Sequence, residues 1–288
     1  MCVVLLLVAC QGAPKIRFPA VYLDMDGTSL GPDGRVRPAT VRALARYRAC
    51  GGRVGVATGR VLAQVTPHLG DLRPDLPIIL YNGAVTLSPD GARVLDEQKL
   101  PPPALRAALD ATRELGGVEA VVLQRADATL LDRDATAYFA ETVPGWDIGA
   151  DAVDPDLYTR SGGDAVKLLV FVAPDRAVAV RDGITAAVGG RARAVISSGI
   201  TVEVLAPGVN KARPIRAALE AAGIAPTDVL TVGDSGNDVE MLRDLGFGVA
   251  MGNCRPEACA AASARIGPHD TDAIAELLER AAMTPACP

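Results

Sequence analysis

The sequence is poor in aromatic residues, histidines and paired cysteines. Phe, Trp and Tyr make up 3% of the 288 residues, which argues against the aromatic stacking surfaces of single-stranded nucleic-acid binders. With two histidines and no CxxC pair, nothing in the chain matches the ligand spacing of a zinc site. The six cysteines are scattered, so we expect mostly unpaired thiols and no disulfide framework. The net charge of -5 also argues against nucleic acid as a partner.

Long hydrophobic runs are also missing, apart from one at the N-terminus. Residues 1–10 (MCVVLLLVAC) are too short to span a bilayer. They resemble the apolar core of a signal peptide or lipoprotein signal, but no Lys or Arg precedes the run. We therefore treat residues 1–16 as an N-terminal extension and expect a cytoplasmic monomer or homodimer without membrane contact. Export or lipid anchoring through residues 1–10 is the alternative.

The chain does contain a repeated alternation of short apolar runs and alanine-rich helical stretches. With 49% hydrophobic and 22% charged residues, the composition is that of an ordinary globular protein. The alternation predicts an α/β fold with a mainly parallel sheet. The expected strands are 21–23, 53–57, 77–81, 229–233 and 248–251, and the expected helices are 38–50, 212–223, 239–245 and 271–282.

The pattern changes between residues 85 and 206. A hairpin signal at 85–95 opens this block, and the stretch from 125 to 164 is less regular. Further elements are expected at 102–115 (helix), 120–124 and 166–173 (strands), 176–188 (helix), and 193–196 and 201–205 (strands). We therefore predict an α+β domain of residues 85–206, inserted into a first domain made of residues 17–84 and 207–288.

Two aspartates, Asp24 and Asp26, end the first predicted strand in the run DMDGT (24–28). One carboxylate can attack an electrophile covalently while its neighbour gives and takes protons. Carboxylates this close repel each other unless one is protonated or a cation lies between them, and Mg²⁺ is the simplest such cation. The alternative is a strand that ends in an Asx turn.

Polar residues also follow the other predicted strands. Thr58-Gly59-Arg60 follows the second strand, Asn82 the third, and Asp234 and Asp238 follow the strand at 229–233. Four acids at strand ends carry too much negative charge to converge without a metal. A hydroxyl at Thr58 and an ammonium at Lys211 would suit phosphoryl oxygens. Taken singly, Thr58 and Asp234 are common helix caps and Lys211 an ordinary surface lysine.

Taken in their order along the chain, the motifs at these strand ends resemble those of the haloacid dehalogenase superfamily of phosphatases, Cof-type branch, subclass IIB. The resemblance covers residue 17 to the C-terminus and implies a Rossmann-like core whose cap domain is the block inserted after Ala84. The family more often has alanine where Cys254 stands. The matching motifs are DMDGT at 24–28, TGR at 58–60, NGA at 82–84, NK at 210–211, GDSGND at 233–238 and MGN at 251–253.

The resemblance also implies a role for each matching residue. Asp24 would be the nucleophile and Asp26 the acid and base. Mg²⁺ would be bound by Asp24, the backbone carbonyl of Asp26 and Asp234, while Asp238 would orient Lys211 or a metal-bound water. The expected phosphate-binding residues are Asp24, Met25, Asp26, Thr58, Gly59, Lys211 and Asn237, and the expected substrate contacts are Arg60 and Asn82.

The expected function is Mg²⁺-dependent hydrolysis of small phosphorylated metabolites, such as sugar phosphates or phosphorylated cofactors, through an aspartyl-phosphate. A phosphomutase using the same intermediate and a non-catalytic metabolite-binding protein are the alternatives. A dehalogenase is disfavoured because carbon–halogen cleavage does not need the proton that Asp26 supplies. Basic residues of the inserted block could face the substrate, although such side chains are usually solvated: Arg125, Arg133, Arg160 and Lys167.

Overall fold

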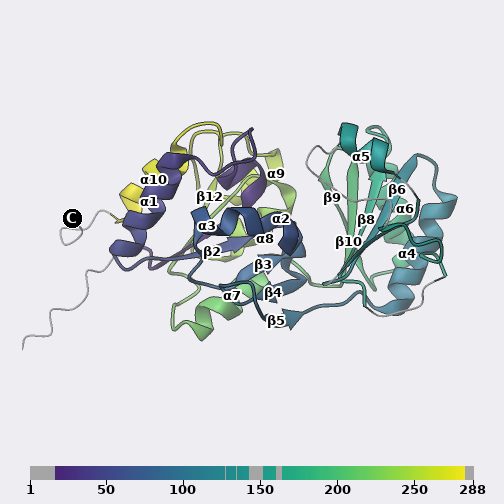
Figure 1. The fold of residues 1–288 in the computed structure, drawn as a ribbon, viewed down its shortest axis with the longest axis horizontal. Coiled ribbons are helices and arrows are strands. Elements are labelled where there is room, and N and C mark those ends of the chain that lie inside the picture. The colour runs from purple at the N-terminus through teal and green to yellow at the C-terminus, as the bar shows by residue number, and fades with distance from the viewer. Residues whose placement is uncertain (1–16, 127, 134, 143–151, 160–163, 283–288) are drawn as a thin grey trace, which may run out of the picture.

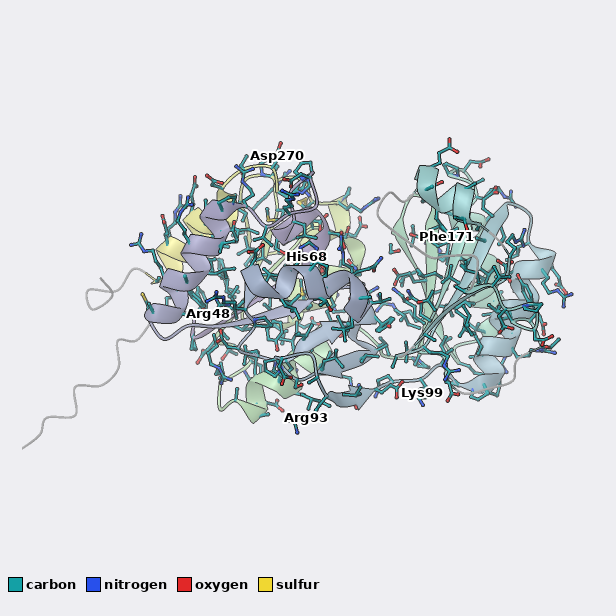
Figure 2. The ribbon with its side chains drawn as sticks, viewed as in Figure 1. Arg48, His68, Arg93, Lys99, Phe171 and Asp270 are labelled. Carbon is teal, nitrogen blue, oxygen red and sulfur yellow. A yellow bond between two sulfur atoms is a disulfide. The ribbon has the colours of Figure 1, made fainter. Side chains whose placement is uncertain are left out.

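The computed structural model describes residues 17–126, 128–133, 135–142, 152–159 and 164–282. These residues form two lobes that lie side by side in Figure 1, each built around its own sheet. Figure 2 shows side chains packed through both lobes, with Phe171 in the second lobe and Lys99 at the connection between them. Within the described ranges the larger sheet has eight strands, in the spatial order β13 (Ala264–Arg265), β12 (Phe247–Ala250), β11 (Val229–Gly233), β1 (Ala20–Leu23), β2 (Arg53–Ala57), β3 (Ile78–Leu80), β4 (Val85–Leu87) and β5 (Val94–Glu97).

Strand β1 lies inside the larger sheet and pairs in parallel with β11 on one side and with β2 on the other. All residues of β1 and β11 are buried. Near-continuous apolar runs of this kind are typical of parallel strands that are covered on both faces. The predicted α/β class with a mainly parallel sheet is confirmed.

Helices cover both faces of this sheet, and alternate residues of β1 point to opposite helical layers. Val21 and Leu23 belong to the core built with α1 (Pro38–Ala49) and α10 (Ala273–Ala282). Ala20 and Tyr22 belong to the core built with α7 (Ala212–Ala221) and α8 (Val239–Asp244). A ligand can therefore reach the sheet only at its ends. The other described helices of this lobe include α2 (Leu62–Val65), α3 (Leu69–Leu72) and α9 (Pro256–Ala261).

The second lobe is an antiparallel sheet whose two faces are covered unequally. Its described strands, in spatial order, are β7 (Thr129–Leu131), β6 (Val118–Gln124), β8 (Lys167–Val172), β10 (Thr201–Leu205) and β9 (Arg193–Ser198). Helices α4 (Pro102–Glu114) and α6 (Ala177–Val188) pack together on one face. The shorter α5 (Thr136–Thr142) packs on the other face, where Phe139 lies against Phe171.

The hairpin of β4 and β5 belongs to the larger sheet, which differs from the predicted organisation. We expected an inserted domain from residue 85 onward, but β4 pairs with β3 and β5 pairs with β4, both antiparallel. The predicted boundary was based on the change in sequence pattern at residue 85, but the hydrogen bonds between β4 and β3 place the hairpin in the larger sheet. We therefore propose that the cap begins after β5, near Leu100, and ends near Leu205.

Two further expectations from the sequence need correction. The stretch from 125 to 164, expected to be less regular, contains β7 and α5. We expected mostly unpaired thiols, but Cys254 and Cys259, five residues apart, form a disulfide across the first turn of α9. Proximity in a tight loop, not a spacing motif, brings these sulfurs together.

Within the described ranges no helix is both long enough and apolar enough to cross a bilayer. The predicted N-terminal extension, including the export or lipid-anchoring alternative for residues 1–10, lies outside the described residues.

We expect Gly248→Ala to destabilise the protein. A Cβ atom at Gly248 in β12 would lie 1.9 Å from the backbone carbonyl oxygen of Leu242, so strand or helix has to shift. The expected loss in the free energy of unfolding, measured by denaturant titration, is about 1–3 kcal/mol. Gly70→Ala is the control because a Cβ there meets nothing within 4 Å. Equal stability of the two variants would contradict the close approach.

Candidate active site

The candidate site lies where four parallel strands of the larger sheet end on the same edge. Asp24 follows β1, Thr58 follows β2, Asn82 comes two residues after β3, and Asp234 follows β11. The carboxyl ends of neighbouring parallel strands meet at one edge, which is where open α/β sheets bind ligands. The structure therefore brings together motifs that are far apart in the sequence.

The loop after β1 turns tightly because Gly27 adopts a left-handed backbone conformation, with φ of +69°. The backbone N–H groups of Ser29 and Leu30 donate to the carbonyls of Asp24 and Met25, which closes the turn. A Cβ atom at Gly27 would lie 2.6 Å from a carboxylate oxygen of Asp234. Glycine is thus needed here both for the backbone conformation and for the approach of Asp234.

Lys211 lies fully buried between two carboxylates at the start of α7. Its Nζ is 2.6 Å from Oδ1 of Asp24 and 2.7 Å from Oδ1 of Asp238. Burial by itself would lower the pKa of Lys211, but the charges of Asp238 and Asp24 outweigh it and raise that pKa above its usual value. Lys211 is therefore held as a cation against the side chain of Asp24.

Asp238 orients its surroundings with both of its oxygens. Oδ1 accepts from Lys211, and Oδ2 accepts from the backbone N–H groups of Asp234 (2.9 Å) and Ser235 (3.0 Å). These bonds fix the turn that carries Asp234 and hold Lys211 in place. The resemblance had assigned Asp238 to orienting Lys211 or a metal-bound water, and the first of these contacts is present in the structure.

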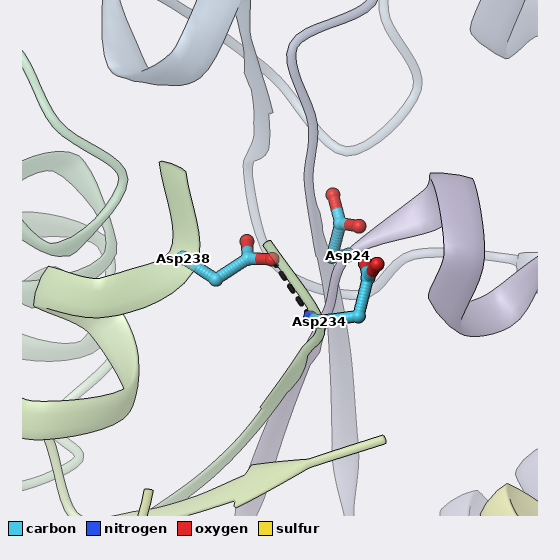
Figure 3. Close-up of side chains that lie close together, drawn as sticks. All are labelled: Asp24, Asp234 and Asp238. Atoms are coloured by element: carbon cyan, nitrogen blue, oxygen red, sulfur yellow. Dashed lines mark hydrogen bonds between the residues drawn. The ribbon is translucent and has the colours of Figure 1, made fainter. Parts of the chain in front are cut away.

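Among the described residues, Asp24, Asp234 and Asp238 form a group whose oxygens lie within 4.8 Å of one another (Figure 3). Burial and the charge of Asp238 raise the pKa of Asp24 well above its usual range, with Lys211 opposing. Burial and Asp238 also raise the pKa of Asp234 to about 6, although a hydrogen bond from Thr28 (3.1 Å) opposes the shift. An oxygen-only donor set with this much buried negative charge fits a hard divalent cation.

Asp26 is not a member of this buried group of carboxylates. Its side chain is 62% exposed and pairs in a bidentate manner with Arg60, whose Nε and Nη2 lie 2.8 and 2.6 Å from the two carboxylate oxygens. Asp26 was expected to bind the metal through its backbone carbonyl, which leaves its side-chain carboxylate available for proton transfer. The expected contact of Arg60 with substrate stays a prediction, and in the structure its guanidinium pairs with Asp26.

The other expected phosphate ligands lie around the loop after β2. Thr58 is buried, and its Oγ1 accepts from the backbone N–H of Arg60 at 3.2 Å. Gly59 lies against Asn82, because a Cβ atom at Gly59 would lie 3.0 Å from the amide oxygen of that side chain. Met25 is fully buried beneath the first loop, so it can offer a ligand only its backbone.

Asn82 occupies an unusual backbone conformation between the two lobes. Tyr81, Asn82 and Gly83 all have positive φ (51°, 58° and 104°), and strain of this kind typically concentrates at functional sites. The Oδ1 of Asn82 accepts from Asn237 at 2.9 Å, and its Nδ2 donates to Glu203 of the cap. Asn82 thus connects a residue of the GDSGND motif to the cap.

Two residues without a predicted role, Glu203 and Asn253, also make contacts at the site. Asn253 donates to the backbone carbonyl of Gly27 (2.8 Å) and accepts from the N–H of His269, which ties the MGN motif to the first loop. A signal for Glu203 was available, because a charged residue in the apolar run 201–205 needs a partner. Of the cap basic residues, Arg133 pairs with Asp132, and Arg160 lies outside the described residues.

Comparison with known proteins gives matches over nearly the whole chain. The family model for haloacid dehalogenase-like hydrolases matches residues 21–278. The HMP-PP phosphatase of Cronobacter sakazakii is 29% identical over 243 residues, which cover 82% of this chain and 85% of that protein. The pyridoxal phosphate phosphatase YbhA of Escherichia coli is 26% identical over 269 residues, which cover 90% and 96% of the two chains.

Solved structures show the same fold. The subclass IIB sugar phosphatase BT4131 superposes with a TM-score of 0.78 at 20% identity, over 90% of this chain and 97% of that one. TM0651 from Thermotoga maritima superposes with a TM-score of 0.77 at 21% identity, over 94% and 99% of the two chains. At these identities the likeness establishes the architecture and leaves substrates open.

We expect Lys211→Met to lower the free energy of unfolding by about 3–5 kcal/mol, because two buried carboxylates lose their counter-charge. Adding Asp238→Asn should recover part of that loss, since one of the two charges is then removed. The measurement is denaturant unfolding of both variants in metal-free buffer at pH 7.5. Lys99→Met, which removes a 44% exposed lysine, is the matched control. Wild-type stability of Lys211→Met would show that Lys211 does not balance the site's charge.

Proposed function

The chain belongs to the haloacid dehalogenase-like hydrolase family, as its motifs had suggested, and on this basis we propose that it is a Mg²⁺-dependent phosphomonoester hydrolase acting on small phosphorylated metabolites. The observation that carries the proposal is the contact of the buried Lys211 cation with Asp24 at the strand ends, beside Asp234. A nucleophile, a cation and a group of oxygen ligands in one place are what phosphoryl transfer requires.

Asp24 acts as the nucleophile. One of its oxygens attacks phosphorus, and the bond between phosphorus and the leaving oxygen breaks, which leaves an aspartyl-phosphate. Lys211 supports this step because its ammonium has three donors, of which Asp24 and Asp238 use two. The third can bind an oxygen of the transferred group.

Asp26 moves the protons. It donates one to the leaving oxygen and then takes one from the water that hydrolyses the aspartyl-phosphate. Its carboxylate is paired with Arg60, so we expect it to exchange this partner for the leaving oxygen during the reaction. Arg60 therefore serves as a resting contact for the acid and base.

The oxygens of Asp24 and Asp234, with the backbone carbonyl of Asp26, would hold Mg²⁺. When bound, the ion supplies positive charge that offsets the repulsion between nucleophile and phosphate. Thr58, Gly59 and Asn237 line the same edge and would complete the phosphate site with a hydroxyl, a backbone N–H and an amide.

The substrate class follows from relatives named as phosphatases of small phosphorylated compounds. Their names include pyridoxal phosphate and HMP-PP, and a structural neighbour is a sugar phosphatase. The acidic, aromatic-poor sequence is consistent with a small metabolite as the partner of this site. Cap closure over the strand ends would exclude water during transfer.

We expect Asp24→Asn to lower kcat by at least about 1,000-fold, since the substitution removes the attacking carboxylate. The assay is release of inorganic phosphate from a panel of sugar phosphates, nucleotides and pyridoxal phosphate, with and without Mg²⁺. Asp110→Asn on the exposed side of α4 is the control and should keep wild-type turnover. Hydrolysis by Asp24→Asn at the wild-type rate would rule out the aspartyl-phosphate.

Mg²⁺ should stabilise the protein more at pH 7.5 than at pH 5. The pKa of Asp234 is raised to about 6 in the metal-free protein, so at pH 5 the ion has to displace a proton, and its apparent affinity falls by about tenfold. The measurement is the increase in Tm with added MgCl₂ at both pH values. Asp234→Asn should lose most of this increase. An equal increase at both pH values would contradict metal binding at Asp234.

The same shift has a second consequence for the metal-free protein. Because the pKa of Asp234 is higher in the folded state than the usual 3.8, folding binds a proton between these values. The contribution of Asp234 to stability therefore decreases as the pH rises from about 4 to about 6. Bound Mg²⁺ should remove this decrease.

A further inference from the structure

A cavity of about 380 Å³ opens in the cap between the last turn of α4 and the start of β6, and we call it the distal cavity. The residues that line it include Arg113, Leu115, Val118, Arg133 and Tyr158. Val118 begins β6, whereas Gln124 ends this strand beside Lys167, which donates to the backbone of Gly59 in the core. A strand of seven residues spans about 20 Å, so this end of β6 lies well away from the catalytic loops.

The distal cavity is positively charged although the protein is acidic. Arg113 and Arg133 line it, and in the described part of the chain none of its lining residues is an aspartate or a glutamate. The chain as a whole carries a net charge of -5. Two guanidinium groups at one cavity therefore create a local attraction for an anion that the overall charge does not provide.

Arg133 is held in place by its neighbour Asp132, whose side chain is 1% exposed. The Nε and Nη2 of Arg133 lie 3.0 and 2.8 Å from Oδ2 of Asp132. The same oxygen accepts from the hydroxyl of Tyr158 at 3.1 Å, and Oδ1 accepts from the backbone N–H of Val121 at 2.8 Å. A guanidinium has five N–H donors, and these bonds use two of them, so donors on the Nη1 edge are left for another oxyanion.

Arg113 reaches the same cavity from α4, where its guanidinium carbon lies 5.1 Å from the ring centroid of Tyr158. Stacking on an aromatic ring orients a guanidinium while its N–H donors stay available at the edge. Within the described ranges no ion pair to Arg113 is found, and the nearby Asp110 pairs with Arg106 instead, at 3.4 Å. Arg113 is thus oriented by a ring and keeps its charge for a partner from outside the chain.

A role in the fold alone accounts for only one of the two arginines. The buried Asp132 needs a counter-charge, and Arg133 supplies it. Arg113 balances no described carboxylate, so its place beside Arg133 is explained by a ligand that both side chains reach. Leu115 and Val118 add an apolar wall, which suits a ligand with a carbon skeleton as well as anionic groups.

We propose that the distal cavity binds a small organic dianion, whose charge lies on a phosphate-type group or on two carboxylates. Arg113 and Arg133 bind the anionic oxygens, and Leu115 and Val118 contact the carbon skeleton. The volume suits a ligand of metabolite size, because pockets for small molecules begin at about 300 Å³. This second site is separate from the catalytic strand ends and does not depend on the proposed phosphatase activity.

The test is isothermal titration calorimetry with two dianions, propylphosphonate and succinate, in metal-free buffer at pH 8.5. Without a metal the carboxylates at the strand ends repel an anion, so binding there is suppressed. The wild type should bind at least one probe with one site per chain. Arg113→Gln should weaken this binding by at least about tenfold, because charge-assisted hydrogen bonds to the ligand are lost.

The matched control is Arg243→Gln, which should bind as the wild type does. Arg243 is 58% exposed and pairs with the adjacent Asp244, much as Arg133, 54% exposed, pairs with Asp132. Arg133→Gln should also weaken binding, and a Tm measurement shows whether each variant is folded. Since Arg113 balances no buried charge, its variant keeps the test decisive even if Arg133→Gln does not fold.

Binding of one probe and not the other supports the site and identifies the anionic group that it takes. Three results would overturn the site. These are no binding of either probe, equal binding by the wild type and folded Arg113→Gln, and binding that appears only after Mg²⁺ is added, which would place the probe at the catalytic strand ends.

Discussion

The structure depends on one electrostatic arrangement, the burial of Lys211 between Asp24 and Asp238. Lys211 supplies the counter-charge for both buried side chains, and their charges in turn hold the pKa of Lys211 above its usual value. The arrangement leaves one net negative charge among these three groups and Asp234 adds another, so the site favours a divalent cation while it keeps a positive group beside the nucleophile. The turns that carry Asp24 and Asp234 are built to hold these groups close together, with Gly27 making the approach possible.

Much of the fold could be predicted because its signals are local. Parallel strands buried on both faces leave continuous apolar runs, and the polar residues after those runs mark the active edge. The hairpin of β4 and β5 was placed in the inserted block, although β4 pairs with β3, because a hairpin pattern is the same whichever strand it pairs with. The short elements β7 and α5 were missed since their periodicity is too brief to separate from a loop.

The residues that make up the site could be predicted from the sequence better than the contacts between them. Sequence motifs identify Asp26 and Arg60, but the bidentate pairing between them depends on the direction in which each loop leaves its strand. The polar residues of the cap are harder still, because Gln124, Lys167 and Glu203 come from different strands and only the register of the sheet aligns them. Their spacing along the chain carries no sign of that alignment.

The order of strands in the larger sheet has a consequence for how the chain acquires its structure. Strand β1 lies between β2, which follows closely in the sequence, and β11, which follows the entire cap. During synthesis one edge of β1 therefore stays open until Val229 is made, and Asp24 has no Lys211 beside it until residue 211 is made. Contacts between distant parts of a chain slow folding, and an open strand edge can pair with another chain. A self-contained cap sheet between the two halves of the core shortens the effective loop once it has folded, which brings the late strand closer to its place.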